Sequence, residues 1–191
     1  MTLLKLVHGH ENLDDDHIKD VARTDRRQAA DLVIRKYRDA IFHHAVHIVK
    51  DYQEAIDVTQ EVFIKAMRER RFFDEGFKMK AWLYRVTSNL CFNLVRNRKR
   101  RTAILDTMPK ATKTEPIQLE DVLHGEKQEE MLAALDQMTE DHKKILMLRY
   151  YSDLSYAEIS DTLGIKLGTV MSRLSRAKNR LMEVLDAPTV S

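Results

Sequence analysis

Apolar residues recur at steps of three and four in the first hundred residues, over the stretches 34–48, 55–66 and 79–94. One face of an α-helix is buried with this period. We therefore expect three amphipathic helices that pack together as a small bundle. No stretch alternates apolar and polar residues for long enough to predict a sheet.

The second half of the chain has shorter helical periods. Met131, Leu135 and Met138 mark one helix, Ile145 and Leu148 mark the next, and two shorter segments follow. Residues 102–118 hold two of the three prolines and lack a helical period, which is typical of a linker. The pattern predicts an all-α protein: two small helical bundles joined by a flexible linker, the C-terminal one a helix-turn-helix.

Local signals define that helix-turn-helix. Ser155 and Glu158 have the spacing of a capping box, which starts a helix, and Gly164 is suited to the positive φ that ends one. A second helix follows after a few residues, with apolar positions at steps of three and four and cations on its other faces. In a helix-turn-helix this second helix enters the major groove, although a solvated helical hairpin has the same basic face. Gly168 and Thr169 near its start would let a phosphate approach the backbone amides.

The distribution of charge supports two contacts with a polyanion. Lysine and arginine number 32 and aspartate and glutamate 30, a net charge of +2, but the charges are segregated. Residues 96–101 and 165–182 contain cations and no anion, whereas acid is concentrated in residues 11–20 and 120–130. Two separate basic faces are typical of a protein that contacts nucleic acid through two surfaces.

No apolar run approaches the roughly 18 residues of a membrane span, and the first residues are too short a run for a signal peptide. We expect a cytoplasmic protein without membrane insertion. The single cysteine, Cys91, excludes an intrachain disulfide, and its apolar setting favours a core position over a redox role.

The N-terminal half carries one aromatic segment beside cations. Phe72, Phe73 and Phe77 lie in a turn that a core cannot bury completely, and Trp82 follows on the next helix. Aromatic rings stack on unpaired bases while cations hold the backbone, so this segment suits single-stranded nucleic acid. The simpler interpretation places Trp82 and Phe77 in the core.

Neither an enzyme nor a metalloprotein is predicted. His43 and His47 could share a helix face with His44 beside them, but no third ligand stands at a defined spacing. Glycine-rich phosphate loops and the common hydrolase motifs are missing from the sequence. We expect no cofactor, no metal and no catalytic residue.

Three motifs together resemble a known family. The segments 57–66 (DVTQEVFIKA), 82–89 (WLYRVTSN) and 154–177 (from LSYAEI through GTVMSRLSRA) are similar, in this order, to a sigma-70-type RNA polymerase sigma factor of the extracytoplasmic-function group. The likeness covers about residues 25 to 185. It implies a first domain that binds core RNA polymerase and opens the -10 promoter element, and a second that reads the -35 element. In such proteins the polymerase core supplies the chemistry.

The resemblance also implies roles for individual residues. Those expected to contact core polymerase are Asp57, Gln60 and Glu61. Those expected to form the pocket for a flipped -10 base are Phe73, Tyr84 and Asn89, and those expected to hold the adjacent phosphates are Arg96, Arg98, Lys99, Arg100 and Arg101. The positions expected at the -35 element are Met171, Ser172, Ser175 and Arg176 in the groove, with Thr169, Arg173 and Lys178 at phosphates or in structural contacts.

The implied organisation is a tail (1–24) without an assigned role, a region 2-like domain (25–101), a linker (102–118), a region 4-like domain (119–186) and a short tail (187–191). Met171 and Ser175 depart from the family pattern, which leaves Arg176 as the main base reader. Lys166 stands where a proline or capping residue is frequent.

The alternative to a sigma factor is a helix-turn-helix regulator with an N-terminal dimerisation or effector domain. It leaves the Asp57, Gln60 and Glu61 face and the aromatic turn unexplained, and a pure protein adaptor leaves both basic clusters unexplained. The resemblance further implies an anti-sigma factor as a partner. From the linker and the acidic segments we expect a compact free protein whose basic DNA surfaces are covered.

Overall fold

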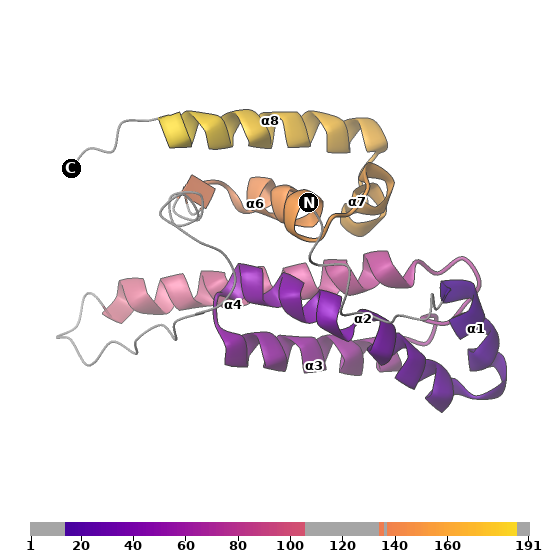
Figure 1. The fold of residues 1–191 in the computed structure, drawn as a ribbon. Helices are drawn as coiled ribbons and strands as arrows, with labels where there is room; N and C mark the ends of the chain where they lie inside the picture. Colours follow the sequence, from indigo (N-terminus) through magenta and orange to yellow (C-terminus); the bar gives the residue numbers. More distant parts are fainter. Residues whose placement is uncertain (1–13, 106–133, 136, 187–191) are drawn as a thin grey trace, which may run out of the picture.

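The computed structural model describes residues 14–105, 134–135 and 137–186. Every regular element within these ranges is a helix, which confirms the prediction of an all-α fold (Figure 1). No helix among them is long and apolar enough to cross a membrane. In chain order the elements are α1 (Asp15–Thr24), α2 (Arg26–Val49), α3 (Tyr52–Arg68), α4 (Met79–Leu105), α6 (Glu140–Leu146), the π-helical turn η1 (Met147–Tyr151), α7 (Tyr156–Leu163) and α8 (Leu167–Asp186).

Helices α1 to α4 form the N-terminal bundle, in which α2 contacts each of the other three. Most predicted core positions of α2 and α3 are buried, and Ile41, Val58 and Val62 are at most 2% exposed, but Ile34 is only half-buried. Asp25 and Asp51 cap α2 and α3, because their carboxylates accept hydrogen bonds from backbone amides of the first turn. Local capping and apolar period thus agree for α2 and α3.

Helix α1 lies in the segment for which the sequence predicts no role. Ile18 is fully buried against the bundle. The Asp15 carboxylate accepts hydrogen bonds from Lys36 Nζ and from Tyr37 Oη, each at 2.6 Å. Burial, reinforced by Asp15, raises the pKa of Tyr37, so this phenol remains a donor at neutral pH. α1 is therefore a fourth member of the bundle.

Helix α4 buries a different face from the one that its apolar period predicts. Of the predicted positions only Met79 is fully buried, and the last, Leu94, is 38% exposed. The cause is that α4 contacts α2 and α3 and also α7, so polar side chains are buried along with apolar ones. After Met79 and Ala81, the buried residues of α4 are Leu83, Tyr84, Thr87, Ser88, Cys91 and Phe92.

The boundaries of the linker also differ from the prediction. Helix α4 continues through residues 102–105, which the composition places in the linker. The rest of the predicted linker, the tails 1–13 and 187–191, and half of the helix predicted over 131–138 lie outside the described residues.

The predicted helix-turn-helix consists of α7 and α8. Ser155 and Glu158 form the expected capping box, in which the Glu158 amide donates to Ser155 Oγ at 3.2 Å and the Ser155 amide donates to Glu158 Oε2 at 2.8 Å. Gly164 ends α7 with φ +65°, a left-handed conformation in which a Cβ is strained. The face of α8 that packs inward carries the predicted Val170, Leu174 and Ala177.

A π-helical turn joins α6 to α7. The Ser152 amide donates to the Met147 carbonyl five residues earlier, at 3.1 Å, and so closes a wider turn than an α-helix has. The turn ends with Ser152, whose hydroxyl lies 2.6 Å from Nδ1 of His44 in α2. η1 thus brings a polar side chain of the second domain to the core of the first.

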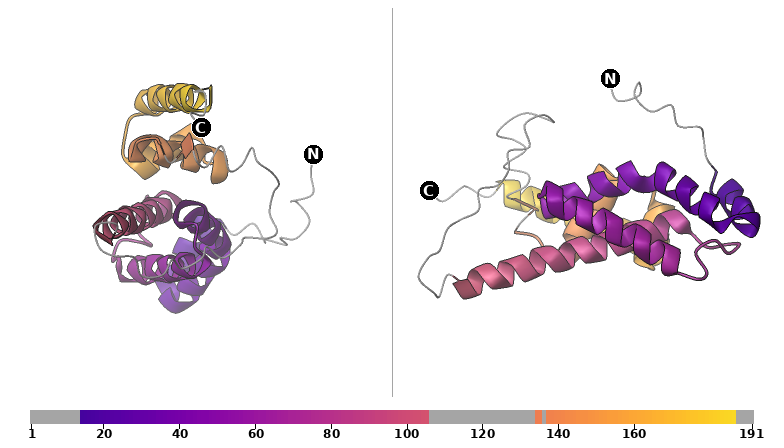
Figure 2. Two further views of the ribbon diagram at one scale, coloured as in Figure 1. Left: turned by 90° about the vertical axis from the view of Figure 1, so that its left-hand side faces the viewer. Right: turned by 90° about the horizontal axis from the view of Figure 1, so that it is seen from below.

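The two bundles pack against each other, mainly through α4 with α7 and α2 with η1. Figures 1 and 2 show three layers, with the N-terminal bundle on one side, α6 and α7 in the middle, and α8 on the far side. The expected compact arrangement is therefore present. The expected covering of both basic surfaces is wrong for α8, because this helix packs on α6 and α7 and keeps its other face in solvent, with Met171 54% exposed.

Candidate polymerase and nucleic-acid interfaces

Helix α3 presents an acidic face to solvent. Asp57, Gln60 and Glu61 are all exposed and stand at i, i+3 and i+4, so they share one side of the helix. Glu61 pairs with Lys65, at 3.2 Å one turn on, which is an exposed and weak ion pair. Ile64 continues this face and is 50% exposed. The apolar period of the sequence does not distinguish such an exposed isoleucine from a core residue. This surface is available to a basic partner.

The segment between α3 and α4 is a turn built on one buried ring. Phe72 is fully buried, and its ring centroid lies 5.3 to 5.5 Å from those of Phe73, Phe77 and Trp82. These three neighbours are only half-buried. The Arg26 guanidinium lies 5.2 Å from the centroid of the Phe73 ring, a cation–π contact. The turn therefore holds partly accessible aromatic rings beside a cation, on a rigid apolar base.

Tyr84 and Asn89, expected in one pocket with Phe73, have different surroundings. Asn89 is exposed, whereas Tyr84 is 4% exposed and lies edge-on to His44, with ring centroids 5.2 Å apart. Burial, with a contribution from the charge of Glu158, raises the pKa of Tyr84 to about 12. In this arrangement Tyr84 faces the second domain.

The cationic end of α4 is exposed at Arg96, Arg100 and Arg101, so the expected covering of the basic surfaces is wrong here too. Arg98 is also exposed, but it donates to the Val49 carbonyl at 3.2 Å and to Glu54 Oε2 at 2.5 Å. It therefore ties α4 to α2 and α3. The side chain of Lys99 lies outside the described part of the chain.

Helix α8 presents the predicted groove-facing residues outward. Met171, Ser172, Ser175 and Arg176 are exposed, and the Arg176 Nε donates to the Ser172 carbonyl at 3.3 Å, one turn back. Of the predicted phosphate or structural contacts, Lys178 is exposed and Thr169 and Arg173 are half-buried.

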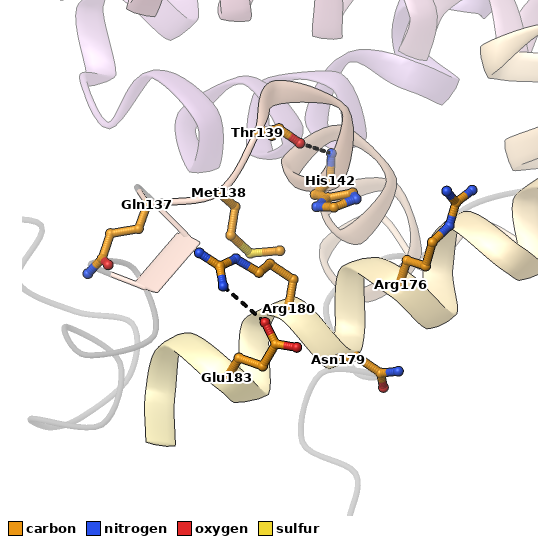
Figure 3. A pocket seen from close by; sticks show the side chains of 8 residues that line it. All are labelled: Gln137, Met138, Thr139, His142, Arg176, Asn179, Arg180 and Glu183. Atoms are coloured by element: carbon orange, nitrogen blue, oxygen red, sulfur yellow. Dashed lines mark hydrogen bonds and ion pairs between the residues drawn. The ribbon is translucent and has the colours of Figure 1, made fainter. Parts of the chain in front are cut away.

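A hollow of about 420 Å³ lies between α6 and α8, next to this outer face. In Figure 3 the Arg180–Glu183 ion pair, at 2.9 Å, lies along one wall, and Thr139 and His142 of α6 lie opposite. Thr139 Oγ1 accepts from the His142 amide as the cap of α6. The hollow is lined by Gln137, Met138, Thr139, His142, Arg176, Asn179, Arg180 and Glu183.

The histidines of α2 serve an internal contact. His44 is 2% exposed, with Nδ1 2.6 Å from Ser152 Oγ and Nε2 2.8 Å from Ser88 Oγ. Burial, together with the charge of His47, lowers the pKa of His44 to about 3. Within the described residues no group of three potential metal ligands occurs, so His43 and His47 find no third ligand there.

Cys91 is a core residue. Its side chain is fully buried, and burial, followed by the charge of Glu54, raises the pKa of the thiol to about 12. A thiol with so high a pKa is almost entirely protonated at neutral pH and is a poor nucleophile.

Comparison with known proteins agrees with this organisation. The family model "Sigma-70 region 2" matches residues 33–101 and "Sigma-70, region 4" matches residues 128–181. The RNA polymerase sigma-H factor of Pseudomonas aeruginosa is 33% identical over 181 residues, 90% of this chain and 93% of that protein. The ECF RNA polymerase sigma factor SigE of Mycolicibacterium smegmatis is 32% identical over 157 residues, 81% of this chain but 61% of that longer protein.

A solved structure has the same fold. The sigma factor RpoE of Bartonella quintana, in complex with the anti-sigma factor NepR, superposes with a TM-score of 0.59 at 25% identity, covering 83% of this chain and 97% of that one.

The helix-turn-helix, the second basic surface and the two matched regions define a non-enzymatic transcription initiation factor. The chain belongs to the sigma-70 family of RNA polymerase sigma factors, in its extracytoplasmic-function group. It is an alternative sigma factor, which binds core RNA polymerase and promoter DNA and directs the enzyme to promoters.

Proposed function

We propose that three surfaces of this chain divide the work of promoter recognition. The acidic face of α3 (Asp57, Gln60 and Glu61) binds core RNA polymerase. The aromatic turn and α4 hold the unpaired strand of the -10 element, and the outer face of α8 reads the -35 element as duplex. We place this activity in the cytoplasm, where it meets the polymerase.

One observation carries this proposal more than any other. Each surface lies on a separate element and is held by contacts that leave its working side chains accessible: Glu61 of α3 and Arg176 of α8 are exposed, and Phe73 in the turn is half-buried. Stacking on Phe73 would repay part of the cost of removing a base from the duplex. Tyr84 can join this site only when the second domain moves away from α4.

Run-off transcription with core RNA polymerase on fragments of the host genome tests the proposal. With the protein added, we expect new start sites that share two upstream elements at a fixed spacing. Without it, those sites should be silent. A silent polymerase combined with specific duplex binding by the protein would instead support a helix-turn-helix regulator.

Replacement of Arg176 by alanine will weaken promoter use at one position of the -35 element. Arginine reads guanine through two hydrogen bonds, and the loss of such a contact costs about 1 to 3 kcal/mol against the preferred base only. Arg101→Ala is the comparison: it should weaken binding on all sequences and lower the salt slope by about one. Binding of each variant, together with core polymerase, to a set of whole promoters singly substituted in the -35 element measures both. Uniform losses for Arg176→Ala would make it a phosphate contact.

An anti-sigma factor is also part of the proposal. The similar RpoE structure is of a complex with the anti-sigma factor NepR. We expect this chain to have a partner of the same kind. Affinity purification of the tagged protein from its host should recover polymerase and a second regulator, and recovery of polymerase alone under inducing and non-inducing conditions would contradict this expectation.

A further inference from the structure

Two ion pairs join the domains directly beside the aromatic turn. Lys78 Nζ lies 2.6 Å from Asp161 Oδ1, and Lys80 Nζ lies 2.5 Å from Glu158 Oε1. The lysines stand at the start of α4, and the carboxylates stand three residues apart on α7. The two carboxylates are therefore neighbours on one side of the helix.

The lysines occupy a particular place in the proposed -10 site. Lys78 follows Phe77 of the aromatic turn, and Lys80 precedes Tyr84 by one helical turn. Along the chain they therefore stand between Phe77 and Tyr84. A strand whose bases stacked on these rings would carry its phosphates past the two ammonium groups, because cations beside stacking rings hold the backbone.

We propose that Lys78 and Lys80 bind phosphates of the unpaired promoter strand, and that Asp161 and Glu158 occupy their place in the closed molecule. The second domain is then a competitor of the promoter strand for one surface. This inference rests on the proposed role of the aromatic turn and α4. It adds two residues to the site and predicts that the free protein binds the strand weakly.

The strength of the contacts fits displacement by DNA. The side chain of Lys78 is 64% exposed and that of Lys80 39%, so each pair is screened by water and contributes little by itself. Burial acts to raise the pKa of Glu158, but hydrogen bonds from Lys80 and Ser155 outweigh it, and the pKa is lowered. Glu158 is therefore an anion at neutral pH, as a phosphate is.

Neutral replacements of the carboxylates test the competition. Glu158→Gln with Asp161→Asn removes two charges with little change of shape, and glutamine can keep the capping box. Binding of a fluorescein-labelled, mixed-sequence single strand of about 12 nucleotides to the full chain is followed by anisotropy. We expect affinity to rise by about three- to tenfold, because the strand-binding surface is then open in a larger fraction of molecules.

The lysines are tested in the same open background. Adding Lys78→Gln and Lys80→Gln should abolish the gain and lower the salt slope of strand binding by about 1.4, the value for two phosphates on a single strand. The matched control is Glu140→Gln with Asp141→Asn, which removes two exposed charges in the first turn of α6.

The results of these binding experiments test the competition and the phosphate site separately. Equal tightening in the α6 control would overturn the competition by α7, and a salt slope that the lysine changes do not alter would overturn the phosphate site. Phe73→Ala separates these results from a failure of the proposed function. If it weakens binding while the lysine changes do nothing, the -10 role stands and the lysine site falls; if neither change affects binding, both fall.

Discussion

Removal of the acidic face of α3 will abolish transcription at every promoter that this sigma factor serves. In the variant Asp57→Asn, Gln60→Ala, Glu61→Gln we expect the affinity for core polymerase to fall by at least about 30-fold, or about 2 kcal/mol, because charged contacts at the centre of an interface cost this much or more when truncated. The fold should be unchanged, since the three side chains are exposed. Competition for core against the unmodified protein measures the loss.

Two controls isolate this effect. The exposed pair Glu140 and Asp141 of α6, neutralised together, should leave core affinity near its original value. Duplex binding through α8 should be the same in the α3 variant as in the unmodified protein. Full transcription by the variant would show that core polymerase binds elsewhere on the chain.

Acidification will open the closed molecule through His44. The pKa of His44 is about 3 in the closed state, and an exposed imidazole has a value of 6.5. The proton thus binds more tightly to the open state, so this contribution to closure is complete above pH 6.5 and is lost as the pH falls from there toward 3. At about pH 5 the loss is about 2 kcal/mol, a factor of roughly 30 in the ratio of closed to open molecules.

As the pH falls from 6.5, the other titratable groups around His44 either favour opening as well or keep the same charge. Burial, followed by the charge of His43, also lowers the pKa of His47, whose ring lies 4.6 Å from that of Tyr151. The pKa values of Tyr84 and Tyr151 are raised, so both phenols stay neutral. Glu158 of α7, with its lowered pKa, stays charged down to acid pH.

Energy transfer between dyes on α3 and α8 measures the opening between about pH 7.5 and pH 5. The variant His44→Gln keeps a side chain that can hydrogen-bond to both serines and removes the titration. We expect the closed-to-open ratio of this variant to change less between about pH 7.5 and pH 5, and the difference from the unmodified protein should equal the contribution given above for His44. An identical pH profile in both proteins would assign the opening to other groups.

Features that depend on neighbouring residues in the chain could be predicted from the sequence. The capping box at Ser155 and the glycine at position 164 involve neighbours in the chain, and so their structure follows from residue type. The exposed face of α8 follows from the period of Val170, Leu174 and Ala177. The same holds for α3, which has one buried side with a regular period.

Contacts between distant segments could not be predicted. His44 and Ser152 are 108 residues apart, and nothing in the period of α2 distinguishes a histidine that bridges two domains from a solvated one. Helix α4 packs on two sides, so its apolar positions do not mark one face. The charge of Glu158 in α7 acts on Tyr84, an influence from the other domain that the sequence does not indicate. α1 has one fully buried residue, Ile18, too few for a recognisable period.

The two helices of the helix-turn-helix use opposite sides for different tasks. Helix α7 faces α4 and supplies the carboxylates that meet Lys78 and Lys80. Helix α8 lies beyond α6 and α7 from the first domain (Figure 1), and its groove-facing side chains are exposed. Substitutions on the outer face of α8 can therefore change which DNA sequence is read without altering how the domains close. In evolutionary terms, promoter preference can diverge among descendants of this chain while the closed state is inherited unchanged.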